Sequence, residues 1–186
     1  MVSGFNSNGA LSTELRIDIH MLNNIGHVWR EVKTAGSVKA KLVILLFRLA
    51  TLYQSSNALL KIISIPFVIL NKVINEWLFC VEIPHRTQIG FGLKIYHPHC
   101  IVVNSDVIIG TNCTLRQGVT IGSVINREGQ VTRSPVLGNQ VELGANAILL
   151  GDITLGDNVK VGAGTVVTKS LAADKIVVGY GIRELN

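Results

Sequence analysis

The stretch LGDITLGDNVKVGAGTVV, residues 150–167, places an aliphatic residue at every sixth position. Leu155, Val161 and Val167 hold this spacing, and glycine follows the first two of them. A helix would repeat its apolar residues about every 3.6 positions and a half-buried strand about every second position, so neither explains the pattern. A fixed period of six is typical of a parallel β-helix, in which each turn of the chain stacks on the previous turn.

The same spacing runs through most of the chain after residue 81. The aliphatic positions are Ile89, Ile95 and Ile101, then, after a slip of two residues, Val103, Ile109, Leu115 and Ile121, and finally Leu137, Leu143, Leu149, Leu155, Val161 and Val167. Small or β-branched residues follow four places later at Val141, Ala147, Ile153, Val159 and Thr165. We therefore expect three hexads to form one triangular turn, with the aliphatic side chains stacked inside a narrow prism.

The corners of such a prism need backbone angles that most side chains resist. Glycine, Asn and Asp accept these angles. The residues in suitable places are Asn112, Asn139, Asn146, Asp157 and Asn158. Because each turn contacts only its neighbours, the hexads specify a shape and leave the chemistry open.

The chain before residue 81 has a helical pattern instead. We divide the sequence into a flexible N-terminus (1–10), an α-helical domain (11–80), a β-helix (81–170) with an extended loop at 122–135, and a C-terminal segment (171–186). Ser12 or Thr13 is a candidate cap for a first helix, and we expect further helices at Ser37–Tyr53 and at 58–79.

The third helical segment, ALLKIISIPFVILNKVINEWLF (58–79), is long and apolar. A membrane span needs about 20 mostly apolar residues. Polar residues interrupt this segment and Pro66 would kink it, so we expect buried helical packing. The alternative is an amphipathic surface that rests on the inner leaflet of a membrane. The basic residues near the headgroups would then be Lys39, Lys41, Arg48, Lys61 and Lys72.

Composition narrows the class of protein. The chain has 186 residues, is 48% hydrophobic with a mean hydropathy of +0.42, and carries a net charge of +5. The charge suits anionic partners, but no basic run is long enough, or interleaved with enough aromatic residues, for nucleic-acid binding. Cys80, Cys100 and Cys113 have no metal-binding spacing, and the N-terminus has no signal-peptide layout. We therefore expect free thiols and a cytoplasmic protein.

Three stretches carry a resemblance to a known family: VEIPHRTQIGFGLKIYHPHCIVVNSDVIIG, TLRQGVTIG and VELGANAILLGDITLGDNVKVGAGTVV. They resemble the hexapeptide acyltransferases of the serine acetyltransferase branch, and within it the acetyltransferases of colanic-acid and capsular-polysaccharide gene clusters. The resemblance implies a mainly-β fold, a left-handed parallel β-helix preceded by an α-helical domain. It also implies transfer of an acetyl group from acetyl-CoA to a hydroxyl group.

Acetyl transfer needs a base that removes the hydroxyl proton while the oxygen attacks the thioester. Histidine titrates near neutral pH, and a carboxylate behind it would fix its tautomer. The resemblance implies that His97 is the base and that Glu82, fifteen residues earlier, is its partner. Glu82 stands where the serine acetyltransferases have aspartate. His99 is the alternative base, followed by His85.

Departures from the serine acetyltransferases bear on the acceptor. Tyr96 replaces the aspartate that precedes their catalytic histidine, and in the loop sequence VTRSPV Arg133 is kept while Ser134 replaces a histidine. The ammonium group of serine would favour a carboxylate, whereas an aromatic ring suits the apolar face of a sugar. We therefore expect a sugar hydroxyl of a capsular or extracellular polysaccharide as the acceptor, bound by Tyr96, Arg133 and Ser134.

The resemblance also implies a groove for CoA between two prisms, where small residues let the pantetheine arm approach the backbone. The matching positions are Gly122, Ser123, Ala145 and Ala163, with Lys169 and Arg183 as partners for the nucleotide phosphates. A shared groove implies a homotrimer or a dimer of trimers, in which the extended loop reaches over a neighbour's active site. We expect Val119, Ile148 and Val166 on the outer faces that meet.

Two other functions stay open. One is the serine acetyltransferase of cysteine synthesis. The other is a non-catalytic β-helix or a metal protein like the γ-carbonic anhydrases. Metal binding of that kind needs three histidines across a subunit interface. No histidine follows His99, so we expect no metal.

Overall fold

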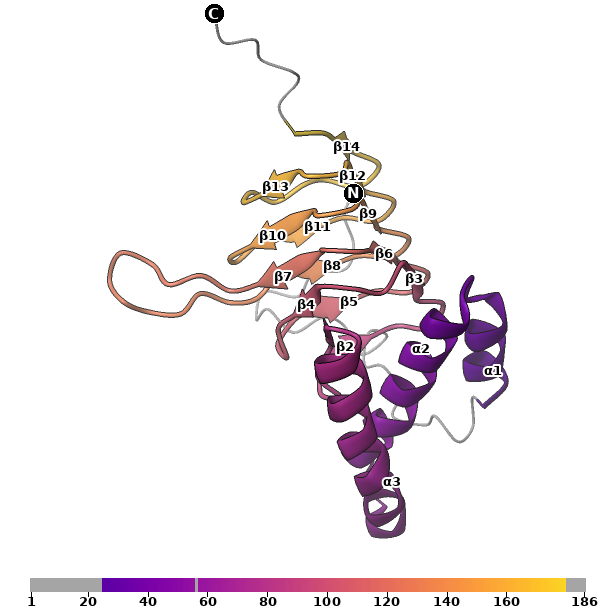
Figure 1. The fold of residues 1–186 in the computed structure, drawn as a ribbon. Coiled ribbons are helices and arrows are strands. Elements are labelled where there is room, and N and C mark those ends of the chain that lie inside the picture. Colours follow the sequence, from indigo (N-terminus) through magenta and orange to yellow (C-terminus); the bar gives the residue numbers. More distant parts are fainter. Residues whose placement is uncertain (1–24, 56, 180–186) are drawn as a thin grey trace, which may run out of the picture.

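The computed structural model describes residues 25–55 and 57–179 (Figure 1). Helical elements come first: α1 (Ile25–Thr34), α2 (Val38–Thr51), η3 (Leu52–Gln54), α3 (Ala58–Leu70) and the π-helix η4 (Asn71–Leu78). The first strand begins at Val81. The segment 1–10, the capping candidates Ser12 and Thr13, and Arg183 lie outside the described residues.

The strands form three parallel sheets, which are the faces of a triangular prism (Figure 1). Face 1 contains β1 (Val81–Glu82), β4 (Ile101–Val103), β7 (Thr120–Gly122), β10 (Ile148–Leu150) and β13 (Val166–Val167). Face 2 contains β2 (Gln88–Ile89), β5 (Ile108–Ile109), β8 (Val136–Leu137) and β11 (Thr154–Leu155). Face 3 contains β3 (Lys94–Tyr96), β6 (Thr114–Arg116), β9 (Glu142–Leu143), β12 (Lys160–Val161) and β14 (Ile176–Val177). The predicted left-handed parallel β-helix after a helical segment is confirmed.

The strand register locates the two-residue slip in the hexads. Val102 pairs with Thr120, 18 residues later, as three hexads require, whereas Tyr96 pairs with Arg116, 20 residues later. The Gly118 N–H donates to the carbonyl of His99, so regular stacking has resumed by His99. The two extra residues are therefore His97 and Pro98, at the corner between β3 and β4.

The interior of the prism follows the sequence pattern. Every aliphatic residue at the predicted six-residue positions is buried, and so are the residues four places later. Val119, which was expected on an outer face, is also buried, and that prediction is wrong. Val119 lies 18 residues after Ile101 and repeats its inward position. Ile148 is half-buried and Val166 is exposed on the outside of face 1.

The predicted corner residues occupy corners. Asn112, Asn146 and Asn158 have φ angles of 58, 57 and 58°, in the left-handed region that Asn tolerates better than most residues. Asn139 Oδ1 accepts a hydrogen bond from the Thr111 N–H at 2.9 Å, and Asp157 Oδ1 accepts one from the Asn139 N–H at 2.6 Å. These side chains satisfy backbone donors of the preceding turn where the strands end.

The predicted helices after residue 37 are confirmed. Ser37 Oγ accepts a hydrogen bond from the Ala40 N–H at 3.1 Å and caps α2. Asn57 Oδ1 accepts from the Leu59 N–H at 2.9 Å and caps α3, which contains Pro66. At the end of η4, the Phe79 N–H bonds to the Ile74 carbonyl, five residues back, as in a π-helix.

A buried ion pair fastens these helices to the first turn of the prism. Arg48 donates to both carboxylate oxygens of Glu31 at 2.8 Å, and to the carbonyls of Ile89 and Gly90 at 2.8 and 2.7 Å. Glu31 Oε1 accepts from the Leu93 N–H at 2.7 Å. These backbone groups border the first turn, which has no earlier turn to pair with. The expectation that Arg48 lies near lipid headgroups is therefore wrong, because its guanidinium is buried here.

The third helical segment is not buried. Within Ala58–Leu78 the fully buried side chains are Ser64, Asn71 and Asn75, and most of the large apolar residues are exposed. The prediction of buried helical packing is wrong for this chain, because the helix packs against α2, η3 and β1 along one side only. Among the described residues, this helix of 21 residues has the length and composition of a membrane span.

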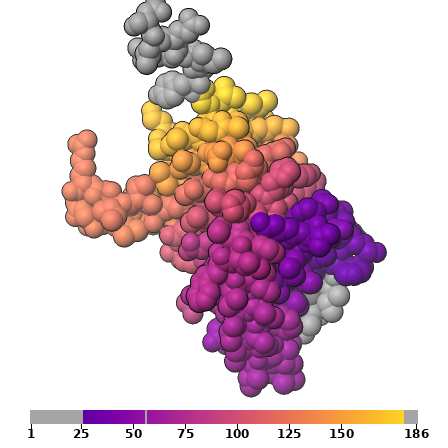
Figure 2. Space-filling model, viewed as in Figure 1, coloured from indigo at the N-terminus to yellow at the C-terminus, as the bar shows by residue number. Residues whose placement is uncertain are grey.

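The expected loop between β7 and β8 is a hairpin. Ile125 and Val131 form an antiparallel bridge, and the Thr132 N–H donates to the Val124 carbonyl at 2.8 Å. Figures 1 and 2 show the hairpin standing clear of the prism. Ile125 and Val131 are exposed in the single chain.

Candidate active site

His97 occupies an irregular corner between face 3 and face 1. Its φ angle is +52°, in a region that costs a non-glycine residue about 1–2 kcal/mol. The side chain is exposed and makes no hydrogen bond within the described part of the chain. Strained backbone is held in place only where the surroundings determine it, and such positions cluster at functional sites.

The other described histidines are engaged elsewhere. His99 Nδ1 lies 3.3 Å from the carbonyl oxygen of Phe79, at the end of η4. The ring of His85 packs edge-on against Tyr53, and burial, with Arg86 nearby, lowers the pKa of its imidazole. His27 packs against Phe91, with 5.4 Å between ring centroids. Of the alternatives considered from the sequence, His99 and His85 both have contacts that are structural.

Glu82 is exposed on the outer surface of face 1, where it pairs in register with Val102. Burial raises the pKa of the nearby Glu76 carboxyl; Lys72 opposes this rise and the Glu82 carboxylate adds to it. Glu82 therefore lies close enough to η4 for electrostatic contact. Among the described residues, no hydrogen bond joins Glu82 to His97, so their partnership stays a prediction.

Two residues beside His97 escaped the sequence analysis. The guanidinium of Arg116 lies 5.1 Å from the ring centroid of Tyr96, its register partner, in a cation–π contact. The Oε1 atom of Gln117 is buried without a hydrogen-bond partner. Neither residue sits at an inward hexad position. Only the register, which stacks residue 116 on residue 96, could have revealed them.

The remaining predicted site residues fall on two different edges of the prism. Ala145 and Ala163 lie on the 3–1 edge, which comprises the corners 97–100, 117–119, 144–147 and 162–165 that lead from face 3 to face 1. The Gly164 N–H donates to the Ala145 carbonyl at 2.8 Å, so the two alanines stack in successive turns. Tyr96 ends the β3 strand at the start of this edge. The structure thus places Tyr96, His97, Ala145 and Ala163 along one edge.

The 1–2 edge, which leads from face 1 to face 2, carries Ser123, Arg133, Ser134 and Lys169, and Gly122 ends the β7 strand directly before it. Arg133 and Lys169 are exposed, whereas Ser134 is buried at the base of the hairpin. Face 1 separates this group from His97, so a single chain does not gather the predicted site.

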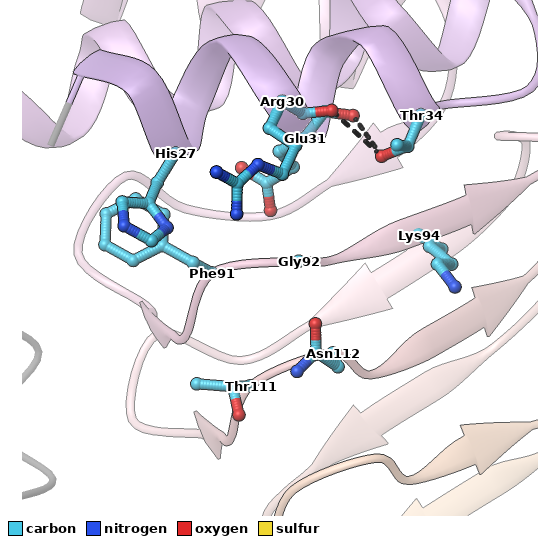
Figure 3. A pocket seen from close by; sticks show the side chains of 9 residues that line it. All are labelled: His27, Arg30, Glu31, Thr34, Phe91, Gly92, Lys94, Thr111 and Asn112. Carbon is cyan, nitrogen blue, oxygen red and sulfur yellow. Dashed lines mark hydrogen bonds between the residues drawn. The ribbon is translucent and has the colours of Figure 1, made fainter.

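A cavity of about 460 Å³ lies elsewhere, between α1 and the corners of the first two turns (Figure 3). It is lined by His27, Arg30, Glu31, Thr34, Phe91, Gly92, Lys94, Thr111 and Asn112. None of the predicted site residues borders it. The Glu31 carboxylate that faces this junction is already bound by Arg48. Within the described ranges, no group of three His, Cys, Asp or Glu residues is arranged to hold a metal ion.

Comparison with known proteins identifies the family. Residues 134–169 match the sequence family described as bacterial transferase hexapeptide (six repeats). The chain is also 40% identical over 150 residues to WcaB of Escherichia coli strain K12, named as a colanic acid biosynthesis acetyltransferase. That match covers 79% of this chain and 91% of WcaB. The chain belongs to the hexapeptide-repeat transferases.

Other hexapeptide-repeat relatives are serine acetyltransferases. The enzyme of Synechococcus elongatus is 40% identical over 99 residues, which are 53% of this chain and 40% of that enzyme. The solved structure of soybean serine acetyltransferase matches with a TM-score of 0.64 and 28% identity, over 79% of this chain and 57% of the soybean chain. Because WcaB and these relatives are all named acetyltransferases, this hexapeptide-repeat chain is an acetyltransferase. It spans about half the length of the serine acetyltransferases that it matches.

Proposed function

We propose that this acetyltransferase moves an acetyl group from acetyl-CoA to a sugar hydroxyl in the biosynthesis of a capsular or extracellular polysaccharide. The observation that carries the proposal is the exposed Tyr96 ring, with Arg116 against it, directly before the strained and exposed His97. The likeness to WcaB supports it, because that likeness extends over 79% of this chain.

His97 acts as the general base in this proposal. Its neutral imidazole accepts the proton of the acceptor hydroxyl while the oxygen attacks the thioester carbonyl carbon. The carbonyl oxygen becomes an oxyanion, which backbone N–H groups stabilise. The C–S bond then breaks, and the imidazolium returns the proton to the departing thiolate. The products are the O-acetyl ester and free CoA, and Glu82 stabilises the imidazolium while it exists.

The residues along the 3–1 edge fit an acetyl-CoA donor. Ala145 and Ala163 stack in successive turns, and a Cβ at the neighbouring Gly164 would meet nothing within 4 Å. Such a surface leaves room for a slender pantetheine arm. Ala145 and Ala163 from one chain, with Gly122 and Ser123 from another, would hold the arm, and Lys169 and Arg183 would bind the nucleotide phosphates.

A sugar acceptor is favoured over serine because Tyr96 offers no carboxylate for the ammonium group of an amino acid. The Arg116 guanidinium beside Tyr96 would repel the ammonium group of an amino acid. Tyr96, Arg133 and Ser134 would bind the sugar. Serine O-acetylation remains the second candidate, because the serine acetyltransferase of Synechococcus elongatus is 40% identical to this chain over 99 residues.

A trimer would complete the site, because the predicted residues of one chain lie on two separate edges of the prism. We propose a homotrimer or a dimer of trimers, in which the 1–2 edge and the hairpin of one chain meet the 3–1 edge of its neighbour. Val102 and Val166 are exposed on face 1 between these edges, as a subunit contact would require. In this scheme residues 11–80 are the helical domain and 81–170 the catalytic domain of a cytoplasmic protein that contacts the inner face of the membrane.

The deciding experiment measures free CoA thiol released from acetyl-CoA with capsule oligosaccharides, simple sugars and L-serine as separate acceptors. The proposal expects turnover with a saccharide, with the O-acetyl ester identified by mass spectrometry. Turnover with L-serine alone would overturn the sugar assignment and leave the second candidate.

A further inference from the structure

The helix Ala58–Leu78 has its polar and apolar sides reversed relative to a helix of a water-soluble protein. Ser64, Asn71 and Asn75 face the protein. Asn75 Nδ2 donates to the Val43 carbonyl at 3.1 Å and to Asn71 Oδ1 at 2.8 Å, which ties the helix to α2. An arrangement with buried polar side chains and exposed apolar side chains is found where lipid surrounds a protein.

The opposite side carries most of the exposed apolar residues of the helix, and we call it the outward face. Its exposed residues are Leu59, Ile62, Ile63, Ile65, Ile69, Leu70, Val73, Trp77 and Leu78. Most follow the spacing of three or four that keeps side chains on one side of a helix. Contiguous exposed apolar surface on this scale marks an interaction site. Figures 1 and 2 show α3 at the end of the molecule away from the last turns of the prism.

The charge distribution indicates what covers the outward face. Residues 25–79 carry seven Lys or Arg and two Asp or Glu, which gives a net charge of +5, equal to that of the whole chain. One acidic residue, Glu31, is neutralised by Arg48. Lys61 and Lys72 are exposed on the same helix as the apolar residues. A second copy would bring like charges together, whereas an anionic lipid surface would complement both the charge and the apolar side chains.

We propose that the outward face binds an anionic membrane, with the helix lying in the plane of the bilayer surface. A span is excluded by the packing, because the helix contacts α2, η3 and β1 along its inner side and offers lipid only its outer side. In this orientation the isoleucines and Trp77 enter the boundary between headgroups and acyl chains, and the lysines contact the headgroups. The proposal does not depend on the acetyl acceptor.

The first test is sedimentation of the full chain with vesicles of phosphatidylcholine and phosphatidylglycerol, compared with phosphatidylcholine alone. Binding should favour the anionic vesicles, and Lys61→Gln and Lys72→Gln should each weaken it about fivefold. The double variant Ile62→Ser/Ile69→Ser should weaken it about a hundredfold or more. The matched control is Ile176→Ser/Val178→Ser, which changes residues of similar exposure (73 and 75%, against 64 and 57%) on the last turn. It should bind as the unchanged chain does.

The second test places the contact on the helix. Trp29→Phe leaves Trp77, which is 72% exposed, as the sole tryptophan. Its emission should move to shorter wavelength when anionic vesicles are added. Absence of vesicle binding, binding that leaves Trp77 emission unchanged, or equal binding by both double variants would overturn the proposal. A smaller oligomer for Ile62→Ser/Ile69→Ser in sedimentation velocity, with no vesicle binding by the unchanged chain, would make this face a subunit interface instead.

Discussion

Arg48 Nε lies 2.8 Å from Glu31 Oε2, and both side chains are buried where α1 and α2 meet the first turn of the prism. The pair also bonds to the backbone of Ile89, Gly90 and Leu93. A parallel β-helix has an open end whose strand edges would expose unpaired backbone groups. The ion pair closes that end and fastens the helices to it.

Removing one member of this pair should destabilise the fold strongly. Arg48→Ala leaves the Glu31 carboxylate buried without its partner, which costs about 3–5 kcal/mol. Urea denaturation measures the loss. The control is Lys160→Ala, which breaks the half-exposed Lys160–Glu142 pair (3.0 Å) and should cost less than about 1 kcal/mol. Equal losses for the two variants would contradict the capping role of Arg48.

Two glycines that follow inward aliphatics, Gly90 and Gly110, should tolerate no side chain. A Cβ at Gly110 would clash with the carbonyl of Gly138 in the next turn, and a Cβ at Gly90 would lie 2.7 Å from the carbonyl carbon of Gly110. Gly110→Ala should therefore lower the free energy of unfolding by about 1–3 kcal/mol. Gly26→Ala, in α1 with open space around it, should raise that free energy by about 0.4–1 kcal/mol. If Gly110→Ala left the free energy of unfolding unchanged, neighbouring turns of the prism would be able to separate enough to accept a side chain.

The three cysteines should differ in reactivity. Cys113 is buried in the prism, and burial raises the pKa of its thiol to about 11, while Cys80 and Cys100 are exposed. An aromatic disulfide reagent at pH 8 should label two thiols in the native protein and the third only after unfolding. Rapid labelling of all three in the native state would mean that the prism opens.

The Cys113 thiol should make the free energy of unfolding depend on pH in the alkaline range. Its pKa in the folded protein lies above the ordinary value of 9.0, so the neutral thiol is favoured by folding. This contribution is fully present below about pH 9 and is lost as the pH rises towards 11. Unfolding midpoints measured between pH 8 and 11 should fall less steeply for Cys113→Ala than for the unchanged chain.

Two substitutions of His97 should separate its role in catalysis from the strain of its backbone. His97→Ala should lower kcat about 10²–10⁴-fold if His97 is the general base, whereas His99→Ala should retain most activity. His97→Gly should be equally inactive but more stable than His97→Ala by about 1 kcal/mol, because glycine accepts the φ angle of +52°. Substantial activity in His97→Ala would exclude His97 as the base. Loss of activity only in His99→Ala would assign that role to His99.

The sequence determined the prism, because the period of six is a local property. It fixes which side chains point inward, and Asn112, Asn146 and Asn158 occupy the left-handed corners that the pattern requires. The pattern also contained the two-residue slip. It also assigns Val119, which lies four places after Leu115 and so occupies the second inward position of its hexad, as Val141 does after Leu137; the expectation of an outer position did not apply this rule.

The tertiary structure decided what depends on contacts between distant parts of the chain. The register placed the slip at His97–Pro98 and stacked Arg116 on Tyr96, twenty residues away. Burial of Arg48 required the open end of the first turn, whose carbonyls need donors. Distant contacts also decided the orientation of the helix Ala58–Leu78. Asn71 and Asn75 donate hydrogen bonds to the backbone of other elements, so their side of the helix is buried and the isoleucines on the other side are exposed. Amphipathic spacing gives two sides to a helix, but only the surface it packs against decides which side is buried.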